Sequence, residues 1–371
     1  MAGSSFGNIF KITTWGESHG KGIGVVVDGC PAGLMLSEDD IQIFLNRRKP
    51  GQSKFTTPRK ESDKVEILSG IFEGKTTGTP ISMIVWNENQ KSRDYSEIAS
   101  YYRPGHADYP FDAKYGFRDY RGGGRSSGRE TIGRVAAGAI ASKLLKEMGI
   151  EVFAYSESIG PISIDKTRFD KSEIEQNKLY MPDAVAALEA EKYLETCMEE
   201  KNSSGGVIYC EVTGLPVGLG EPVFEKIDAN LAKAMFSIGA VKGFEIGDGF
   251  GVATATGLTN NDAFHLNHET GIIQKATNHS GGTLGGMTDG APLTMRVAIK
   301  PTPSIAATQK TVNKSGEEID IEIKGRHDPI IVPRAVVVVE SMAALTILDA
   351  LLLNMSSRLD KITEFYSDIS K

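Results

Sequence analysis

Two histidines on sharply turned backbone are the residues of this 371-residue chain best suited to proton transfer. His19 follows Ser18 in a glycine-containing stretch, and His106 follows Gly105. Glycine permits tight turns that leave a neighbouring side chain accessible, and an imidazole exchanges a proton near neutral pH. Each histidine is therefore either an acid or base that reaches a ligand, or a loop residue with no chemical role.

A glycine-rich loop with three arginines occupies residues 121–131 and reads RGGGRSSGRET. Apolar residues at helical spacing follow over residues 132–148, so the loop leads into the N-terminus of a predicted helix. Backbone N–H groups and the helix dipole favour an anion there, and Arg125 and Arg129 add guanidinium groups that match phosphate or carboxylate. The spacing fits neither a P-loop nor a dinucleotide fingerprint. A solvated linker is the alternative, but linkers rarely run straight into an apolar helix.

Further candidate binding groups lie elsewhere in the chain. A second glycine-rich loop spans residues 278–286, and a lysine with two hydroxyl residues lies in residues 300–304. Arg48, in the last turn of a predicted helix, either complements the helix dipole or faces a substrate. Asp349 lies on an apolar stripe, where a carboxylate is costly unless it is paired. We expect Asp349 to be either a structural partner or a chemical group with a perturbed pKa.

Composition excludes several classes of protein. A net charge of −7 argues against general nucleic-acid binding, so any anion site must be local. The three cysteines show no metal-ligand spacing and fit reduced thiols in the cytosol. The N-terminal residues lack the pattern of a secretory signal. We expect His265 and His268 to be surface residues, because no further metal ligands lie near them in the sequence.

Strands and helices are predicted along the whole chain. Short β-branched runs predict strands over residues 9–14, 23–27, 66–72, 80–86, 151–156, 207–212, 293–299 and 336–339. Helical patterns begin at Ser37 and end before Pro50, and they recur over residues 132–148, 183–199, 227–236 and from Ser341 onward. The apolar run over residues 335–353 is interrupted by Glu340 and Asp349, which favours a buried core over a membrane span.

A weak internal repeat relates the two halves of the sequence. VDGCPAGL at residues 27–34 matches VTGLPVGL at residues 212–219, and TGTPISMIV at residues 77–85 resembles DGAPLTMRV at residues 289–297. The matching order predicts two similar α/β units, over about residues 9–150 and 200–360, with one site between them. Two glycine-rich loops, several cations and two loop histidines together indicate a pocket for polyanionic ligands.

Six segments resemble, in order, the signature blocks of the chorismate synthase family. They are GESHG at residues 16–20, RPGHAD at 103–108, the loop at 121–131, GDGF at 247–250, KPTPS at 300–304 and GRHDP at 325–329. The resemblance implies one domain over residues 1–371. It also implies an α+β fold, a β-α-β sandwich of antiparallel sheets and helices in two pseudo-twofold halves, and a homotetramer.

The resemblance also implies a reaction. The family converts 5-enolpyruvylshikimate 3-phosphate to chorismate by anti-1,4-elimination of phosphate and a C6 hydrogen, as the last common step of the shikimate pathway. It requires reduced FMN without net redox change. Substrate and cofactor carry several negative charges, which fits the clustered cations of this sequence.

Residue roles follow only from the resemblance. His106 would protonate the leaving phosphate, His19 would protonate the reduced flavin or its surroundings, and Asp349 with Ser18 would help to take a proton from flavin N5. The substrate candidates are Arg48, Arg103 and Arg129. The cofactor contacts implied are Arg125, Ser126, Ser127, Gly239, Ala240, Gly285, Lys300, Pro301, Thr302, Pro303, Ser304 and Arg326.

The sequence departs from the family pattern at two positions. Lys54 stands where relatives often have arginine, and Gly239 stands where many have asparagine. A phosphate contact by Lys54 is therefore in doubt, and Gly239 offers only its backbone. No dinucleotide fingerprint is present, so we expect a cytoplasmic, monofunctional enzyme supplied by an external flavin reductase. The alternatives are an FMN oxidoreductase that uses NADPH, and a non-catalytic FMN- or phosphate-binding protein.

Overall fold

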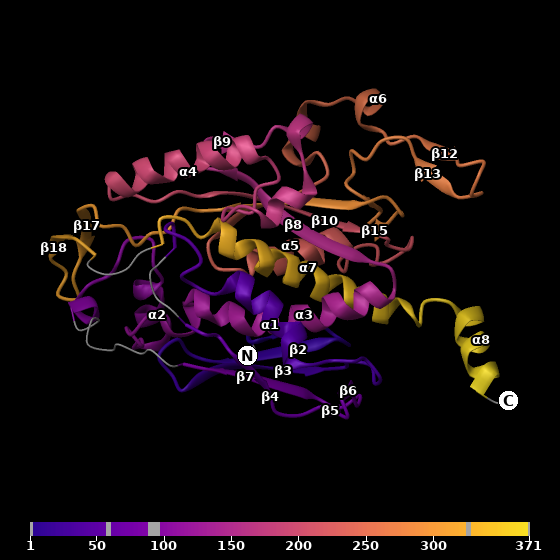
Figure 1. The fold of residues 1–371 in the computed structure, drawn as a ribbon, viewed down its shortest axis with the longest axis horizontal. Coiled ribbons are helices and arrows are strands. Elements are labelled where there is room, and N and C mark those ends of the chain that lie inside the picture. Colours follow the sequence, from indigo (N-terminus) through magenta and orange to yellow (C-terminus); the bar gives the residue numbers. More distant parts are fainter. Residues whose placement is uncertain (1–2, 57–60, 88–96, 324–327, 370–371) are drawn as a thin grey trace.

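The computed structural model describes residues 3–56, 61–87, 97–323 and 328–369. Two five-stranded antiparallel sheets enclose a layer of helices between them (Figure 1). This arrangement confirms the predicted sandwich of antiparallel sheets and helices. The predicted duplication of two halves stays a prediction.

The first sheet is built from the N-terminal part of the chain. Its strand order is β1-β2-β3-β7-β4, with bounds Ser5–Phe6, Lys11–Gly16, Gly22–Asp28, Ile81–Trp86 and Val65–Ile67 respectively. Exposed and buried residues alternate along β2, so one face of the sheet packs on the core. Trp15 and Trp86, the two tryptophans of the chain, lie on the other, exposed face. The short strands β5 (Ile71–Phe72) and β6 (Lys75–Thr76) form a separate hairpin.

The second sheet has the strand order β11-β16-β10-β8-β9. The bounds are Val241–Ile246, Leu293–Ile299, Gly206–Thr213, Glu151–Ile159 and Ile162–Ser163 in that order. Strand β10 is central and pairs with β16 on one side and with β8 on the other. Its buried residues alternate with half-buried ones, as expected for a strand with one face on the core.

Four helices fill the space between the sheets: α1 (Glu38–Arg48), α3 (Thr131–Glu147), α5 (Ile227–Phe236) and α7 (Val332–Asn354) (Figure 1). Helix α3 packs against β3 of the first sheet, and α7 packs against β8 and β10 of the second. The two helices also contact each other closely. A Cβ atom on Gly138 of α3 would lie 2.2 Å from the Cβ of Ser341 in α7, so glycine is needed at this crossing.

Helix α7 corrects one prediction. Residues 336–339 form no strand, because α7 runs without interruption from Val332 to Asn354. Pro333 lies in the first turn, where it favours helix initiation, and burial of nearly every side chain outweighs the strand preference of four consecutive valines. The helix is long and apolar enough to cross a membrane, but most of it is buried inside the protein, as the sequence predicts for a core helix.

Smaller elements surround the sandwich at one end. Helix α2 (Asp108–Tyr115) and the hairpin of β17 (Gln309–Val312) and β18 (Glu318–Ile321) lie together there (Figure 1). A β-bridge joins Tyr101, in the segment before α2, to Asn313, in the turn of this hairpin. Ile98 of the short 3-10 helix η2 (Glu97–Ser100) packs with Tyr101, Ile321 and Ile323 in a separate small core.

Other segments lie on or beyond the outside of the second sheet. Residues 161–178 contain the 3-10 helices η5 (Lys166–Arg168) and η6 (Lys171–Glu175), and α4 (Ala184–Glu199) contacts β9. A short hairpin, β14 (Thr283–Leu284) with β15 (Met287–Thr288), precedes β16. Three elements project from the body: α6 (Gly257–Asn260), the hairpin of β12 (Phe264–Leu266) and β13 (Ile273–Lys275), and α8 (Leu359–Ile369) (Figure 1).

Candidate active site

His19 lies in the loop that follows β2, and its side chain is buried against the glycine-rich loop. Only 8% of the residue is exposed, and Nδ1 lies 3.2 Å from the Oγ of Ser18. Ser18 Oγ also donates a hydrogen bond to the carbonyl oxygen of Gly122 at 3.2 Å. A Cβ atom on Gly122 would lie 2.2 Å from Cε1 of His19, and Gly122 has a φ of +62°. Glycine at position 122 is therefore required for this packing.

The glycine-rich loop forms two short 3-10 turns, η3 (Gly124–Ser126) and η4 (Gly128–Glu130), before α3 begins. Ser127 caps the second turn by accepting a hydrogen bond from the N–H of Arg129. The guanidinium of Arg125 donates to the carbonyl oxygen of Gly16 and to Thr14, with Nη2 2.7 Å from Thr14 Oγ1. Arg125 thus ties the loop to the end of β2.

Two of the three predicted substrate arginines share one buried carboxylate. Nη1 of Arg48 lies 2.8 Å from Oδ2 of Asp63, and Nη1 of Arg129 lies 3.1 Å from Oδ1 of the same residue. Arg129 also donates two hydrogen bonds to Oδ1 of Asn87. Its Nη1 lies 3.5 Å from Oε2 of Glu61. These contacts bring α1, the segment before β4 and the glycine-rich loop together at one place.

A third arginine, Arg334 of α7, completes this cluster. Its Nε donates to the backbone oxygen of Arg48 at 3.1 Å, and its Nη1 pairs with Asp328 at 2.7 Å. Burial lowers the pKa of Arg48 to about 9; Asp63 opposes this shift, while Arg334 and Arg129 add to it. Arg48 therefore keeps its positive charge at neutral pH. Its Nη2 atom is buried and has no hydrogen-bond partner among the described residues.

His106 lies in a second group of polar residues. Its Nδ1 is 3.0 Å from the carbonyl oxygen of Pro104, so Nδ1 carries a proton, and its Nε2 is 2.9 Å from Oγ of Ser304. Burial, followed by the charge of Arg103, lowers the pKa of His106, although the hydrogen bond to Pro104 opposes the shift. The free imidazole is therefore neutral at pH 7, with Nε2 accepting from the Ser304 hydroxyl.

Arg103, the third predicted substrate arginine, is already occupied. It pairs with Asp108 through two hydrogen bonds of 2.8 and 2.9 Å. Burial raises the pKa of Asp108, but the contacts with Arg103 outweigh it and hold the pKa below its ordinary value. Next to this pair, Lys300 Nζ donates to the carbonyl oxygen of Gly105 at 2.9 Å. The ion pair and the lysine together fix the loop that holds His106.

Several predicted cofactor contacts meet at the end of β16. The N–H of Lys300 donates to the carbonyl oxygen of Ala240 at 2.9 Å, which joins residues 239–240 to residues 300–304. Ala240 has a φ of +75°, a conformation that side chains rarely adopt. A Cβ on Gly239 would meet nothing within 4 Å, so its backbone borders open space. Oγ1 of Thr302 is buried and has no hydrogen-bond partner among the described residues.

Other predicted contacts lie apart from this group or outside the described residues. Gly285 forms the turn between β14 and β15, and Gly286 beside it packs on Lys226. Arg326 lies outside the described residues. Lys54 is exposed and pairs with Glu195 at 2.5 Å.

Asp349 is not near Ser18, which corrects the expected pairing of these two residues. Its carboxylate accepts hydrogen bonds from the backbone N–H groups of Asn8, Ile9 and Phe10, and from the Asn8 side chain, at 2.7–3.0 Å. These residues precede β2, whereas Ser18 follows its other end. At about 3.3 Å per strand residue, the two groups are separated by roughly 20 Å. Asp349 therefore anchors the chain where it enters the first sheet.

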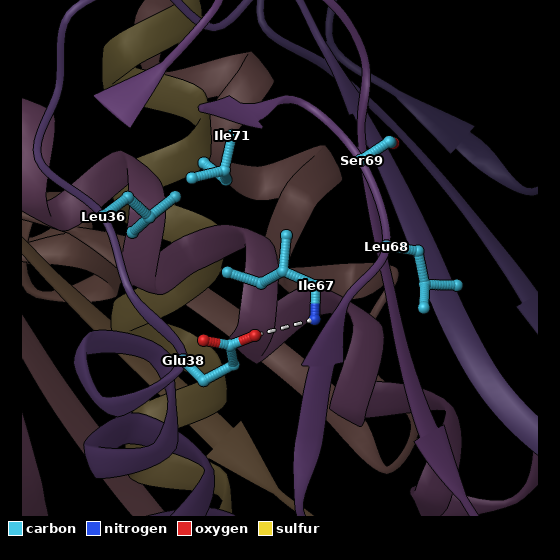
Figure 2. Close-up of a pocket in the computed structure, with 6 residues that line it drawn as sticks. All are labelled: Leu36, Glu38, Ile67, Leu68, Ser69 and Ile71. Carbon is cyan, nitrogen blue, oxygen red and sulfur yellow. Dashed lines mark hydrogen bonds between the residues drawn. The ribbon is translucent and has the colours of Figure 1, made fainter. Parts of the chain in front are cut away.

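A hollow of 170 Å³ on the first sheet is unrelated to these groups (Figure 2). It lies between the start of α1 and the segment from β4 to β5, and it is lined by Leu36, Glu38, Ile67, Leu68, Ser69 and Ile71. None of the predicted site residues lines it.

Comparison with known proteins assigns the chain to a family. A sequence model of the chorismate synthase family matches residues 10–352. The chain belongs to the chorismate synthase family. The chorismate synthase of Agathobacter rectalis is 75% identical over 369 residues and matches over the full length of both chains. That of Roseiflexus castenholzii is 52% identical over 97% of this chain and 100% of the relative. A crystal structure of chorismate synthase has a TM-score of 0.76 and 33% identity, with 98% of each chain covered.

Membership of the chorismate synthase family confirms the resemblance found in the signature blocks. The match also supports the sandwich fold, because the solved chorismate synthase has the same overall structure. Sequence reasoning missed Asp63, Asn87 and Arg334, which complete the surroundings of Arg48 and Arg129. One feature of the sequence could have pointed to Arg334: it lies six residues after Asp328, which belongs to the last signature block.

Proposed function

We propose that this chain catalyses the chorismate synthase reaction, the elimination of phosphate and a C6 hydrogen from 5-enolpyruvylshikimate 3-phosphate. The family match over residues 10–352 is the observation that carries this proposal. The contacts of the buried arginines and of the two histidines support it, because the substrate is a polyanion and its leaving group is a phosphate.

The substrate anions are bound by the cluster of Arg48, Arg129 and Arg334. Three carboxylates, Asp63, Glu61 and Asp328, already balance the three guanidinium charges. Within the described part of the chain these charges cancel, so we expect binding to depend on guanidinium N–H groups that have no partner there. Nη2 of Arg48 is such a group. Arg103 positions the His106 loop through Asp108 instead of binding the substrate.

The residues at the end of β16 fit a flavin phosphate and ring. The buried, unpartnered Oγ1 of Thr302 and the open space beside Gly239 are the features that support this fit. Residues 239–240 and 300–304 would hold reduced FMN, together with Arg326, and residues 125–127 would border it. Reduced FMN supplies electron density to the allylic system when it is bound.

His106 acts as the acid toward the leaving phosphate. In the free protein its imidazole is neutral, because burial and Arg103 lower its pKa. A bound phosphate close to Nε2 would raise the pKa of His106, so the imidazole would take up the proton that it donates to the departing phosphate. Ser304 orients Nε2, and the Pro104 carbonyl holds the tautomer. Ser18 Oγ donates to the carbonyl oxygen of Gly122 and therefore accepts from Nδ1 of His19, so His19 holds a proton beside the glycine-rich loop.

Asp349 has a structural role in this proposal. Its four hydrogen bonds to residues 8–10 satisfy the carboxylate where it stands. The enzyme is cytoplasmic, monofunctional and a homotetramer, and it receives reduced flavin from a separate reductase. The lack of a dinucleotide fingerprint in the sequence supports the requirement for an external reductase.

An anaerobic assay tests the proposed reaction. The protein is mixed with 5-enolpyruvylshikimate 3-phosphate and photoreduced FMN, and chorismate absorbance and phosphate release are followed. A parallel reaction contains NADPH and oxidised FMN only. We expect product with reduced FMN alone. Product under both conditions would instead show a built-in reductase, and product under neither would refute the proposed activity.

A further inference from the structure

The hairpin of β12 and β13 presents an uncovered apolar face. Its register pairs Leu266 with Ile273, and Phe264 lies two residues from Leu266 on the same face of the strand. These three side chains are 49%, 66% and 60% exposed. Lys275, the partner of Phe264, lies on the same face, but its ammonium is buried at the base of the hairpin. The opposite face carries His265 and its partner Gln274. The hairpin is therefore amphipathic, but no other part of the described chain covers its apolar side.

The exposed apolar surface extends along the whole projecting segment. We call residues 249–275 the arm; it comprises the 3-10 helix η7 (Gly249–Thr254), α6 and the hairpin. Phe250 and Leu258 are 82% and 99% exposed, and Ile272 is 56% exposed. Figure 1 shows α6 and the hairpin projecting beyond the layers of the sandwich. A two-stranded hairpin is marginally stable in water without packing against another surface.

The root of the arm is rigid even though its apolar side is bare. Nζ of Lys275 is buried with 1% of its side chain exposed, and it contacts Asp289 at 2.7 Å and Asp262 at 3.2 Å. It also donates to Ser280 Oγ at 2.6 Å and lies 3.0 Å from Asn278 Oδ1. A buried ammonium with this many oxygen partners fixes the position of the hairpin, because leaving any of these charges unpaired would be costly.

Asp262, at the other side of the root, joins the arm to the second glycine-rich loop. Its carboxylate accepts the N–H groups of His279 and Ser280 at 2.8 and 3.0 Å. Burial raises the pKa of Asp262, but these N–H donors and Thr277 outweigh it and hold the pKa well below its ordinary value. The carboxylate stays charged, and the hairpin is held in one orientation relative to the body.

The charge of the arm indicates what covers it. Asp262 and Lys275 of the arm pair with each other, and Glu269 is the only other acidic or basic residue among Asp, Glu, Lys and Arg in its sequence. It therefore lacks the lysines and arginines that draw an amphipathic segment to anionic lipid. A surface that is apolar, nearly uncharged and rigidly held is typical of interfaces between copies of one chain, which are more apolar than transient interfaces.

The area is also sufficient for such an interface. Each of the six apolar side chains named above would bury roughly 100 Å² from its present exposure. Two arms docked reciprocally about a twofold axis, with the surfaces they cover, would bury about 2,000 Å² or more, as in stable homo-oligomers.

We propose that the arm docks through the apolar face of its hairpin on a second copy of this chain. The inference rests on the homotetramer of the proposed function and specifies one contact within it. The rigid root then serves a purpose, because an arm held in one orientation loses little conformational entropy when the second copy binds.

Two matched substitutions on one strand test the docking. Ile273→Glu places a carboxylate on the apolar face, whereas Gln274→Glu places the same charge on the polar face one residue away. Both residues belong to the described hairpin and neither lies in the proposed active site. Light scattering and sedimentation over a range of protein concentrations give the association state. We expect Ile273→Glu to weaken association at least about tenfold and Gln274→Glu to leave it near that of the unsubstituted chain.

Hydrogen exchange of the unsubstituted chain provides an independent measurement. The hairpin amides should become protected as protein concentration rises, in parallel with association. An oligomer that is unaffected by Ile273→Glu and leaves these amides unprotected would overturn the arm contact while the homotetramer stands. A chain that stays monomeric at all concentrations would overturn both, and the anaerobic assay would still report the reaction separately.

Equal weakening of association by both variants would show a charge effect instead of docking. Flotation of the chain with neutral or anionic vesicles would identify a membrane and also overturn the proposal.

Discussion

His106 has two fixed hydrogen-bond partners, and this geometry makes a sharp prediction for turnover. The substitution His106→Gln removes the proton donor but keeps a polar side chain. We expect turnover with reduced FMN to fall by about 10²–10⁴-fold, the usual contribution of a general acid, while FMN affinity changes little. Anaerobic stopped-flow assays and flavin titrations measure the two quantities.

Ser304→Ala is the matched control for His106→Gln. It removes the hydroxyl that lies 2.9 Å from Nε2 but leaves the imidazole in place. We expect a smaller loss of turnover than for His106→Gln, because the acid remains and only its orientation is relaxed. Equal loss of flavin binding and turnover in His106→Gln would contradict the acid role.

The lowered pKa of His106 also predicts a pH dependence of stability. Folding favours the neutral imidazole, so the folded state binds fewer protons than the unfolded state, whose histidine has a pKa of about 6.5. This contribution to stability is present above that pKa and is lost as the pH falls below it and through the lower pKa of the folded state. We expect urea denaturation to show a larger loss of stability between pH 7.5 and 5.5 for the unsubstituted chain than for His106→Gln. An identical loss in both would contradict the lowered pKa.

Asp349 offers a test between an anchor and a chemical group. Asp349→Asn replaces a carboxylate that accepts four hydrogen bonds with an amide that has one acceptor oxygen. We expect the free energy of unfolding to fall by about 2–4 kcal/mol, because buried N–H donors lose their acceptors. The folded fraction should retain its turnover. A variant that keeps its stability but loses its turnover would show that Asp349 acts in the reaction and does not serve as an anchor.

Some residue environments could be predicted from sequence, but others depended on long-range contacts. Arg129 was selected as a candidate from the glycine-rich signature block, and Arg48 from its place in the last turn of a predicted helix. No local pattern could show that Asp63 lies between their guanidinium groups, or that Arg334 approaches from α7. Asp349 was expected to be either paired or chemically active, and the structure gives it backbone partners from the far end of the sequence.

At the scale of elements, α3 and α7 cross closely at Gly138 and Ser341. Gly138→Ala would place a methyl group 2.2 Å from the Cβ of Ser341, so the two helices must separate. We expect a loss of about 1–3 kcal/mol of stability despite the better helix propensity of alanine. Gly128→Ala is the control, because its added Cβ would meet nothing within 4 Å. Chemical denaturation measures both, and equal stabilities would contradict the packing argument.

Most elements followed from periodicity, and the failures have physical causes. Helix α5 and strand β16 have the predicted bounds because each has a clear pattern and a clear end. Residues 336–339 were expected to be a strand from their four valines, but they belong to a helix that is buried along its length. In such surroundings periodicity disappears, since nearly all positions are apolar. The β12–β13 hairpin was missed because its apolar residues lie in a polar stretch.

At the scale of the whole molecule, both halves of the chain contribute to the candidate site. Arg48 of the first half meets Arg334 of the second, and His106 meets Ser304. The sequence repeat predicted a site between two similar halves, and that duplication stays a prediction. The repeat could not show which loops meet, because loop contacts depend on how the two sheets face each other across the helix layer.

Helix α8 tests how much of the molecule the sandwich needs. It projects from the end of α7, and it lies beyond the region matched by the family model. Leu359 and Phe365 are 80% and 57% exposed. We expect deletion of residues 358–371 to leave the thermal unfolding midpoint and turnover close to those of the full chain, because little buried surface is lost. A large drop in either quantity would show that α8 packs in the functional assembly.

The position of the two tryptophans has a practical consequence for experiments. Trp15 lies in β2 two residues before Glu17, and Trp86 ends β7 beside Asn87, whose side chain donates to the carbonyl oxygens of Glu17 and Gly20. Both tryptophans therefore lie in strands that border the loop that carries His19, and the sequence has no other tryptophan. Intrinsic fluorescence excited at the indole band is thus a built-in optical reporter of this loop, readable during ligand titrations without any attached dye.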